Sequence, residues 1–190
     1  MKKKNELVRL VLCALFAALI VVMTFTPYLG YITVGVIEIT TLHMVVIFGA
    51  CLLGAKYGAI LGGVWGLTCI ARAFQFGIIP FQNPMVSLVP RIIVGLVAGL
   101  VFLGLSKTKC KKPVALGLSA LLGTLTNTVL VLSSLQLFGG FQVLFGDAAK
   151  TLDVIITTLI STNGLIELIG AVLLVPALYM ATHKYIKDKI

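Results

Sequence analysis

Five polar residues fall inside apolar stretches of this chain, where membrane-spanning segments normally exclude them: His43, Arg91, Asn127, Asn163 and Glu167. Counting inward from the ends of the apolar stretches places all five in the same half of a bilayer. An ionisable side chain is costly in the hydrocarbon region, so such a residue indicates a functional site by default. The five residues therefore predict one polar site buried in the membrane.

The residue types suit a small ligand that forms hydrogen bonds. Arg91 can clamp an anion through two N–H groups, the asparagine amides offer donors and acceptors, and Glu167 offers acceptors. Asn163 and Glu167 are four positions apart, which at about 100° per residue puts them on one helix face. Further contacts from the outer loops could come from Arg72, Gln75, Gln82 and Asn83.

A purely structural role is the alternative for the same residues. Arg91 and Glu167 could pair with each other while the asparagines bond neighbouring helices, and a single His such as His43 is typical of helix–helix hydrogen bonds. Motifs of common enzymes are absent: the sequence has no Gly-x-Ser-x-Gly, His-Glu-x-x-His, Cys-x-x-Cys or Gly-x-x-x-x-Gly-Lys-[Ser/Thr]. The chain is therefore not expected to be an enzyme or to hydrolyse ATP itself.

Composition indicates an integral membrane protein. Of the 190 residues, 59% are hydrophobic and 11% are charged, and the mean hydropathy is +1.13, whereas soluble domains are about 25% charged. The length allows a single membrane domain over residues 1–190. The net charge of +9 sits at segment ends without interleaved aromatics, which argues against nucleic acid. The four cysteines have neither disulfide nor zinc spacing, and no metal or cofactor is expected.

Six apolar segments predict an all-α protein with six transmembrane helices. The expected spans are Leu7–Phe25, Ile39–Leu53, Tyr57–Ala71, Val86–Leu105, Pro113–Leu137 and about Val154–Ala181. The second and third are shorter than the usual ~20 residues, so they are expected to extend or to tilt. The first begins like a signal peptide but is too long and lacks a cleavage site, so we expect it to be retained.

Lys and Arg gather on one side of the predicted spans. That side holds Lys2–Lys4, Arg9, Lys56, the lysines of 107–112 and those of 184–189, against Lys150 and Arg72 on the other. The positive-inside rule then makes both termini cytoplasmic. The outer connections Thr26–Glu38, Arg72–Met85 and Phe138–Asp153 are long, which favours loops capping a substrate pocket, although they could be passive connectors.

Small residues recur every four positions in three segments. The stripes are Gly54, Gly58, Gly62 and Gly66 in the third span, Gly95 and Gly99 in the fourth, and Ala14 and Ala18 in the first. Such stripes let helix backbones approach closely in lipid. The glycines favour packing within the bundle, while the alanine stripe could face a partner protein.

Three classes of function fit a chain of this kind. One is a solute-binding membrane subunit that needs an energising partner. A self-sufficient secondary transporter is another, but such proteins often have duplicated halves, and no convincing repeat is present. The third is a membrane enzyme such as a lipid hydrolase, for which no nucleophile–base pair stands out.

The sequence resembles the substrate-binding S components of energy-coupling factor (ECF) vitamin transporters over essentially its whole length. The resemblance rests on six spans and on a series of short segments: 14–18 (ALFAA), 41–50 (TLHMVVIFGA), 90–95 (PRIIVG), 126–128 (TNT) and 163–167 (NGLIE). It implies a six-helix fold in the bacterial cell membrane whose outer loops close over one vitamin-sized molecule.

The resemblance also implies partners. The first helix would dock through Ala14 and Ala18 on a transmembrane coupling protein that carries two cytoplasmic ATPases, and Asn127, Asn163, Glu167 and Arg91 would line the pocket. The segments around His43 and Arg91 are most similar to pantothenate-type members, and a carboxylate substrate would suit Arg91. Pyridoxine-like and hydroxymethylpyrimidine compounds are the alternative substrates.

Overall fold

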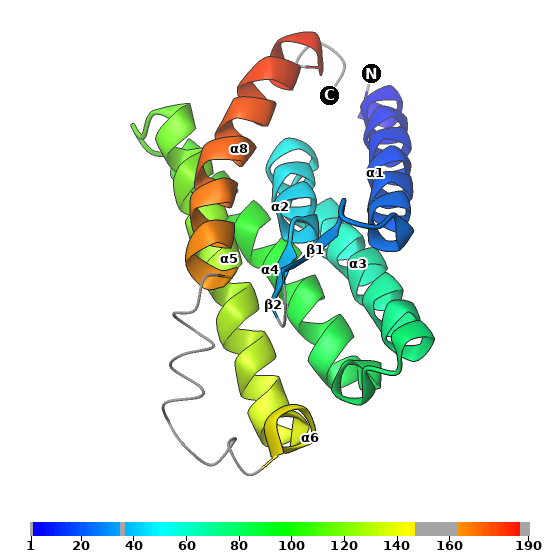
Figure 1. Cartoon of the computed structure of the whole chain (residues 1–190). Helices are drawn as coiled ribbons and strands as arrows, with labels where there is room; N and C mark the ends of the chain where they lie inside the picture. The colour runs from blue at the N-terminus through cyan, green and yellow to red at the C-terminus, as the bar shows by residue number, and fades with distance from the viewer. Residues whose placement is uncertain (1, 35–36, 147–162, 187–190) are drawn as a thin grey trace.

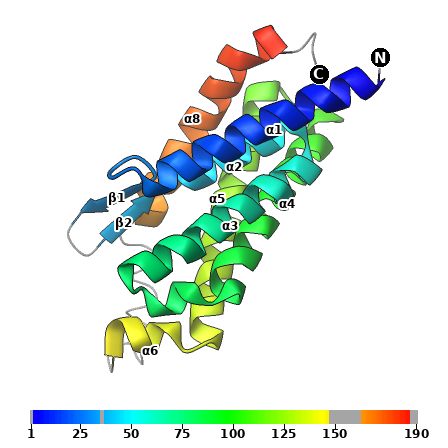
Figure 2. The same cartoon turned by 90° about the vertical axis from the view of Figure 1, so that its right-hand side faces the viewer.

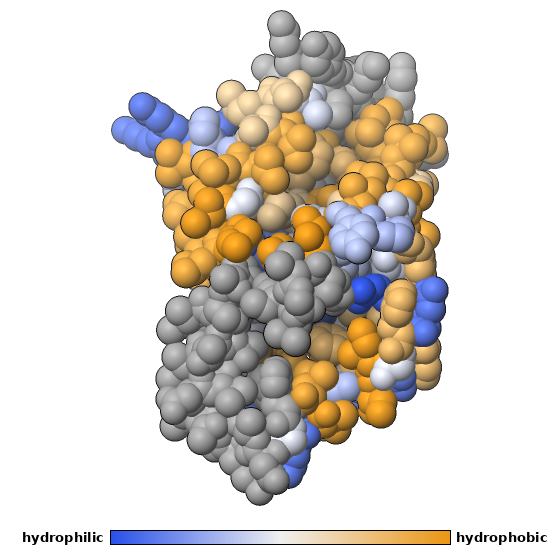
Figure 3. Space-filling view, in the orientation of Figure 1, coloured by the Kyte–Doolittle hydropathy of each residue, from blue (hydrophilic) through white to orange (hydrophobic). Residues whose placement is uncertain are grey.

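Long apolar helices run side by side in the structure, a computed structural model that describes residues 2–34, 37–146 and 163–186 (Figure 1). They are α1 (Lys2–Phe25), α3 (Ala55–Phe76), α4 (Pro84–Ser106), α5 (Lys112–Leu137) and α8 (Asn163–Ile186). Each is long and apolar enough to span a membrane. Leucine, valine, isoleucine and phenylalanine side chains dominate their exposed surface (Figure 3), as lipid surroundings favour. The chain is a predominantly helical integral membrane protein.

A shorter helix, α2 (Leu42–Leu53), occupies the middle of this bundle. It packs against all five long helices, and nearly all of its side chains are buried. The predicted second span was wrong at its start, because Ile39 and Thr40 belong to a β-strand. With 12 residues, α2 is shorter than a usual span. The count of six transmembrane helices therefore stays a prediction.

A small antiparallel hairpin joins α1 to α2, and most of it lies in the connection Thr26–Glu38 that was predicted to be a loop. Its strands are β1 (Tyr31–Val34) and β2 (Ile37–Thr40), with Tyr31 directly opposite Thr40. Both strands are rich in β-branched residues, which suit a pleated conformation. Gly30 precedes the hairpin, and a Cβ there would overlap the carbonyl oxygen of Met23 in α1. The hairpin therefore begins where the chain lies directly against α1.

Glycines set the close contact between α3 and α4. A Cβ on Gly58 or Gly95 would overlap the other residue's carbonyl oxygen, and one on Gly62 would overlap the carbonyl of Arg91. These contacts confirm the prediction that the glycine stripes pack within the bundle. Gly54 is the exception, since it has φ +105° in the turn between α2 and α3.

The described ends of the chain lie at one end of the bundle, and the short helices η1 (Ile79–Gln82) and α6 (Gly140–Phe145) lie at the other (Figures 1 and 2). This arrangement is compatible with two cytoplasmic termini, which stay a prediction. The third span extends as expected, so that Arg72 lies within α3 and not at its end. The part of the predicted sixth span before Asn163 lies outside the described residues.

Candidate functional site

The position of the Arg91 side chain follows from the proline that precedes it in the sequence. Pro90 lies inside α4 and has no N–H, so the carbonyl of Val86, four residues earlier, loses its helical donor. The Arg91 side chain replaces that donor, with Nη1 donating to the Val86 carbonyl oxygen at 2.6 Å. The Pro-Arg pair thus folds the guanidinium back along its own helix.

The Arg91 guanidinium is enclosed by aromatic rings. Its Cζ lies 5.1 Å from the centre of the Trp65 ring and 5.8 Å from that of Phe81. Arg91 is only 5% exposed, and its Nε has no hydrogen-bond partner within the described part of the chain. Glu167 lies near enough for electrostatic attraction, but the two side chains form no ion pair in the structure. The direct Arg91–Glu167 ion pair, which was the alternative prediction, is therefore not formed.

Other buried polar atoms also lack partners. Among the described residues, they include Tyr31 Oη, both ring nitrogens of His43, Trp65 Nε1 and Asn127 Oδ1. His43 is fully buried, with its ring centre 6.5 Å from that of Trp65. Burying a polar group without a hydrogen bond costs roughly 1–3 kcal/mol. Several such groups together are expected where a ligand supplies the missing partners.

Glu167 connects α8 to the hairpin. Its side chain is buried, and Oε1 accepts a hydrogen bond from the backbone N–H of Thr40. Because Thr40 pairs with Tyr31 across the hairpin, this bond also fixes the strand that carries the Tyr31 hydroxyl. Asn163 begins α8, and its side chain lies outside what the structure describes.

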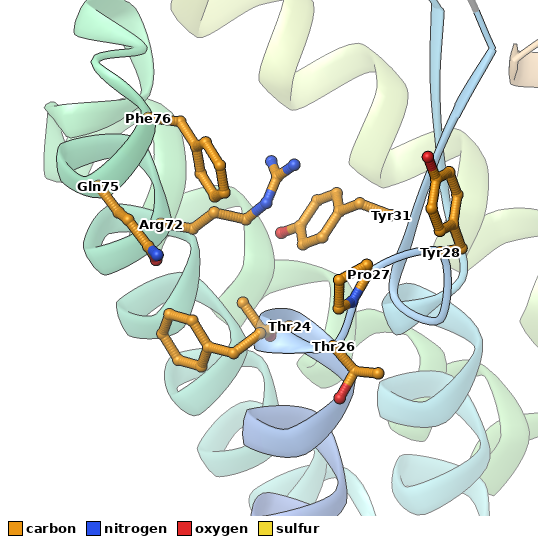
Figure 4. Close-up of a pocket in the computed structure, with 9 residues that line it drawn as sticks. Thr24, Thr26, Pro27, Tyr28, Tyr31, Arg72, Gln75 and Phe76 are labelled. Carbon is orange, nitrogen blue, oxygen red and sulfur yellow. The ribbon is translucent and has the colours of Figure 1, made fainter.

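Arg72 lies over one face of the Tyr31 ring. Its guanidinium carbon is 4.0 Å from the centre of the Tyr31 ring and 5.1 Å from that of Phe76. These residues line a hollow of about 290 Å³ between the ends of α1 and α3 and the start of β1 (Figure 4). Tyr31 therefore has Arg72 against its ring, while its hydroxyl lies near the side chains of Trp65 and Cys69.

Gln82 and Asn83 have structural contacts. Gln82 Nε2 donates to the Ala73 carbonyl oxygen at 3.4 Å, which ties η1 to the end of α3. Asn83 is the N-cap of α4, and its Oδ1 accepts from the backbone N–H of Met85 at 2.9 Å. A ligand contact for either residue stays a prediction.

Ala14 and Ala18 lie on the exposed side of α1. The opposite side packs into the bundle through Cys13, Ile20 and Thr24, which are buried. The two alanines are thus accessible to a partner, as the sequence suggested, and their coupling role stays a prediction.

Sequence reasoning did not select Tyr31 and Trp65 as site residues. Trp65 lies in an apolar run, where an aromatic residue usually indicates core, and Tyr31 lies in a segment predicted to be a loop. The available signal was their chemistry: each combines an apolar ring with one polar group that needs a partner when buried.

A bundle of apolar helices with a polar site enclosed among them defines a membrane protein that binds a small solute. Residues 8–179 match the family model for the substrate-specific component of ECF transporters, and the chain belongs to this family.

Two relatives span nearly the whole chain. The chain is 33% identical to the pantothenic acid transporter PanT of Lactococcus lactis subsp. cremoris over 202 residues, covering 97% of each protein. It is 34% identical to the pantothenate transporter PanT of Leuconostoc mesenteroides subsp. mesenteroides over 188 residues, covering 92% of this chain and 91% of that one. The protein is therefore a vitamin-capturing, multi-pass component of a transporter in the bacterial cell membrane, working with an ECF module.

Proposed function

We propose that this chain captures pantothenate from outside the cell for ATP-driven uptake. The observation that carries the proposal is the Arg91 guanidinium, which is buried and forms no ion pair among the described residues. Removing a charge from water is costly unless an opposite charge or strong hydrogen bonds compensate it. An anionic substrate would supply that compensation.

Pantothenate has the groups that the site calls for. It carries one carboxylate, one amide and two hydroxyls, all on a flexible aliphatic chain. The carboxylate would face Arg91, and the amide N–H or a hydroxyl would donate to Asn127 Oδ1, which has no partner in the described structure. Both relatives named above are pantothenate transporters. Pyridoxine and hydroxymethylpyrimidine lack a carboxylate and would leave Arg91 uncompensated.

The energy for transport would come from partner subunits. Family membership supports a transmembrane coupling protein and two cytoplasmic ATPases, and the exposed Ala14 and Ala18 of α1 offer a smooth helix surface for docking. In this proposal the chain binds and presents its substrate without chemically changing it.

Direct binding to the purified chain tests the proposal. Isothermal titration calorimetry of the detergent-solubilised protein should show saturable binding of pantothenate. The bound pantothenate should be recovered chemically unchanged. Pantothenol, in which a primary alcohol replaces the carboxylate, should bind more weakly. Saturable binding of a pyridoxine-type compound, with none of pantothenate, would contradict the proposal.

A further inference from the structure

Three hydrogen-bond donors without acceptors come together around Arg91. They are Arg91 Nε from α4, Trp65 Nε1 from α3 and Tyr31 Oη from β1. The Trp65 ring lies 5.1 Å from the guanidinium carbon, and the Tyr31 hydroxyl lies near the Trp65 side chain and within electrostatic reach of Arg91. In the part of the chain that the structure describes, none of the three donors has an acceptor at hydrogen-bond distance. The Trp65 and Cys69 side chains lie near the Tyr31 hydroxyl without making such a bond.

Burial keeps the Tyr31 hydroxyl a donor. Burial raises the pKa of the phenol above its usual range, and the nearby positive charge of Arg91 offsets this only in part. The group therefore stays protonated at physiological pH. Trp65 Nε1–H can only donate. A ligand atom placed among the three groups can therefore satisfy all of their N–H and O–H donors only by accepting hydrogen bonds.

The structural supports of the three donors are independent of a ligand. Nη1 of Arg91 is already used by the Val86 carbonyl, Trp65 is fully buried, and Tyr31 is held by Arg72 over its ring at 4.0 Å. The donors are thus preorganised, which lowers the entropic cost of ordering them around a ligand.

We infer that Tyr31, Trp65 and Arg91 form a cradle for one carboxylate, in which Tyr31 and Trp65 determine specificity for the anion over its uncharged analogues. A carboxylate has two oxygens with about four acceptor positions, enough for all three donors. A primary alcohol offers a single oxygen and no charge. The inference rests on the proposed function for the identity of the carboxylate ligand.

Two variants remove one donor each and keep the ring. Tyr31→Phe deletes the hydroxyl but preserves the ring under Arg72, and Trp65→Phe deletes the indole N–H. Each should weaken pantothenate binding by about tenfold, because an unsatisfied acceptor is created. Pantothenol affinity should change much less, so the ratio of the two affinities should fall.

Tyr57→Phe is the matched control, since Tyr57 lies in the first turn of α3 and is partly buried away from the cradle. It should leave both affinities unchanged. Thermal unfolding of each variant verifies folding, and Trp65, the chain's single tryptophan, reports binding by fluorescence in the wild-type, Tyr31→Phe and Tyr57→Phe proteins. Should Tyr31→Phe fail to fold, Trp65→Phe measured by titration calorimetry decides alone.

The outcomes separate the two proposals. If wild-type protein binds pantothenate and both donor variants leave the affinity ratio unchanged, the cradle is wrong and the proposed function stands. If wild-type protein binds no pantothenate, the proposed function fails and the cradle falls with it. A parallel loss for both ligands would indicate a merely structural role and would also overturn the cradle.

Discussion

The backbone N–H of Thr40 donates a hydrogen bond to the buried Oε1 of Glu167, which lies 127 positions further along the chain. The bond joins the last residue of β2 to the first turns of α8. Thr40 is also the partner of Tyr31 across the hairpin. One carboxylate therefore stabilises the strand pair that presents Tyr31 to the site.

Removing this carboxylate should release the hairpin. Glu167→Ala leaves the Thr40 N–H without its acceptor, so we expect pantothenate affinity to fall by roughly 10- to 100-fold, or about 1–3 kcal/mol. Hydrogen exchange at the Thr40 amide should become faster. Glu167→Gln retains an acceptor oxygen and should lose much less pantothenate affinity. Unchanged exchange at Thr40 in the alanine variant would show that the bond does not hold the strand.

Arg91→Gln should reduce pantothenate binding far more than pantothenol binding. The substitution removes the charge that compensates the ligand carboxylate, and breaking such a buried pair typically costs about 2–5 kcal/mol. Titration calorimetry with the two ligands measures both losses. Lys56→Gln, which removes an exposed charge at the start of α3, is the control and should change neither. Equal losses for the two ligands would argue against a carboxylate at Arg91.

Bulky residues on the exposed face of α1 should separate uptake from binding. Ala14→Trp and Ala18→Trp should abolish pantothenate uptake by whole cells, because a large ring prevents close approach of a partner helix. Binding to the isolated chain should stay nearly intact. Leu173→Trp places the same ring on an exposed position of α8 and should affect neither. Loss of binding in a folded Ala14 or Ala18 variant would contradict this division of roles.

Two alanine substitutions within α4 should differ in their effect on stability. Gly95→Ala places a Cβ against the Gly58 carbonyl and should destabilise the fold by about 1–3 kcal/mol through overpacking. Gly104→Ala meets no atom within 4 Å and should leave stability unchanged or raise it by up to ~1 kcal/mol through helix propensity. Thermal unfolding in detergent measures both. Equal melting temperatures would mean that α3 and α4 can separate without cost.

The features predicted best from the sequence are those that residue type alone makes evident, such as a polar side chain whose burial is energetically unfavourable. Charged and amide residues are conspicuous in apolar runs, and Arg91, His43, Asn127 and Glu167 are all buried in the structure. The glycine stripe was equally easy to interpret, because small residues at every fourth position strongly favour close packing between helices. Asn83 could have been assigned as a cap, because an asparagine before a proline is a typical start of a helix.

The features that escaped prediction depend on three-dimensional context. The stretch from Ile39 to Leu53 has no Gly, Pro or acidic residue where the strand gives way to the helix, so hydrophobicity did not reveal that the strand ends at Thr40 and a helix follows. Nothing in the sequence around Trp65 indicates that it is a site residue. Its role follows only from the positions of Arg91 and Tyr31, which come from two other elements.

The shortness of α2 has a consequence for how this protein is assembled. Its 12 residues extend about 18 Å, whereas the hydrocarbon region is about 30 Å thick, and polar backbone at membrane depth must be enclosed by protein. A helix of this length leaves polar backbone at both ends within the hydrocarbon region, and it leaves the ribosome before α3, α4, α5 and α8. We therefore expect cooperative insertion, in which α2 reaches its final position only when the later helices surround it.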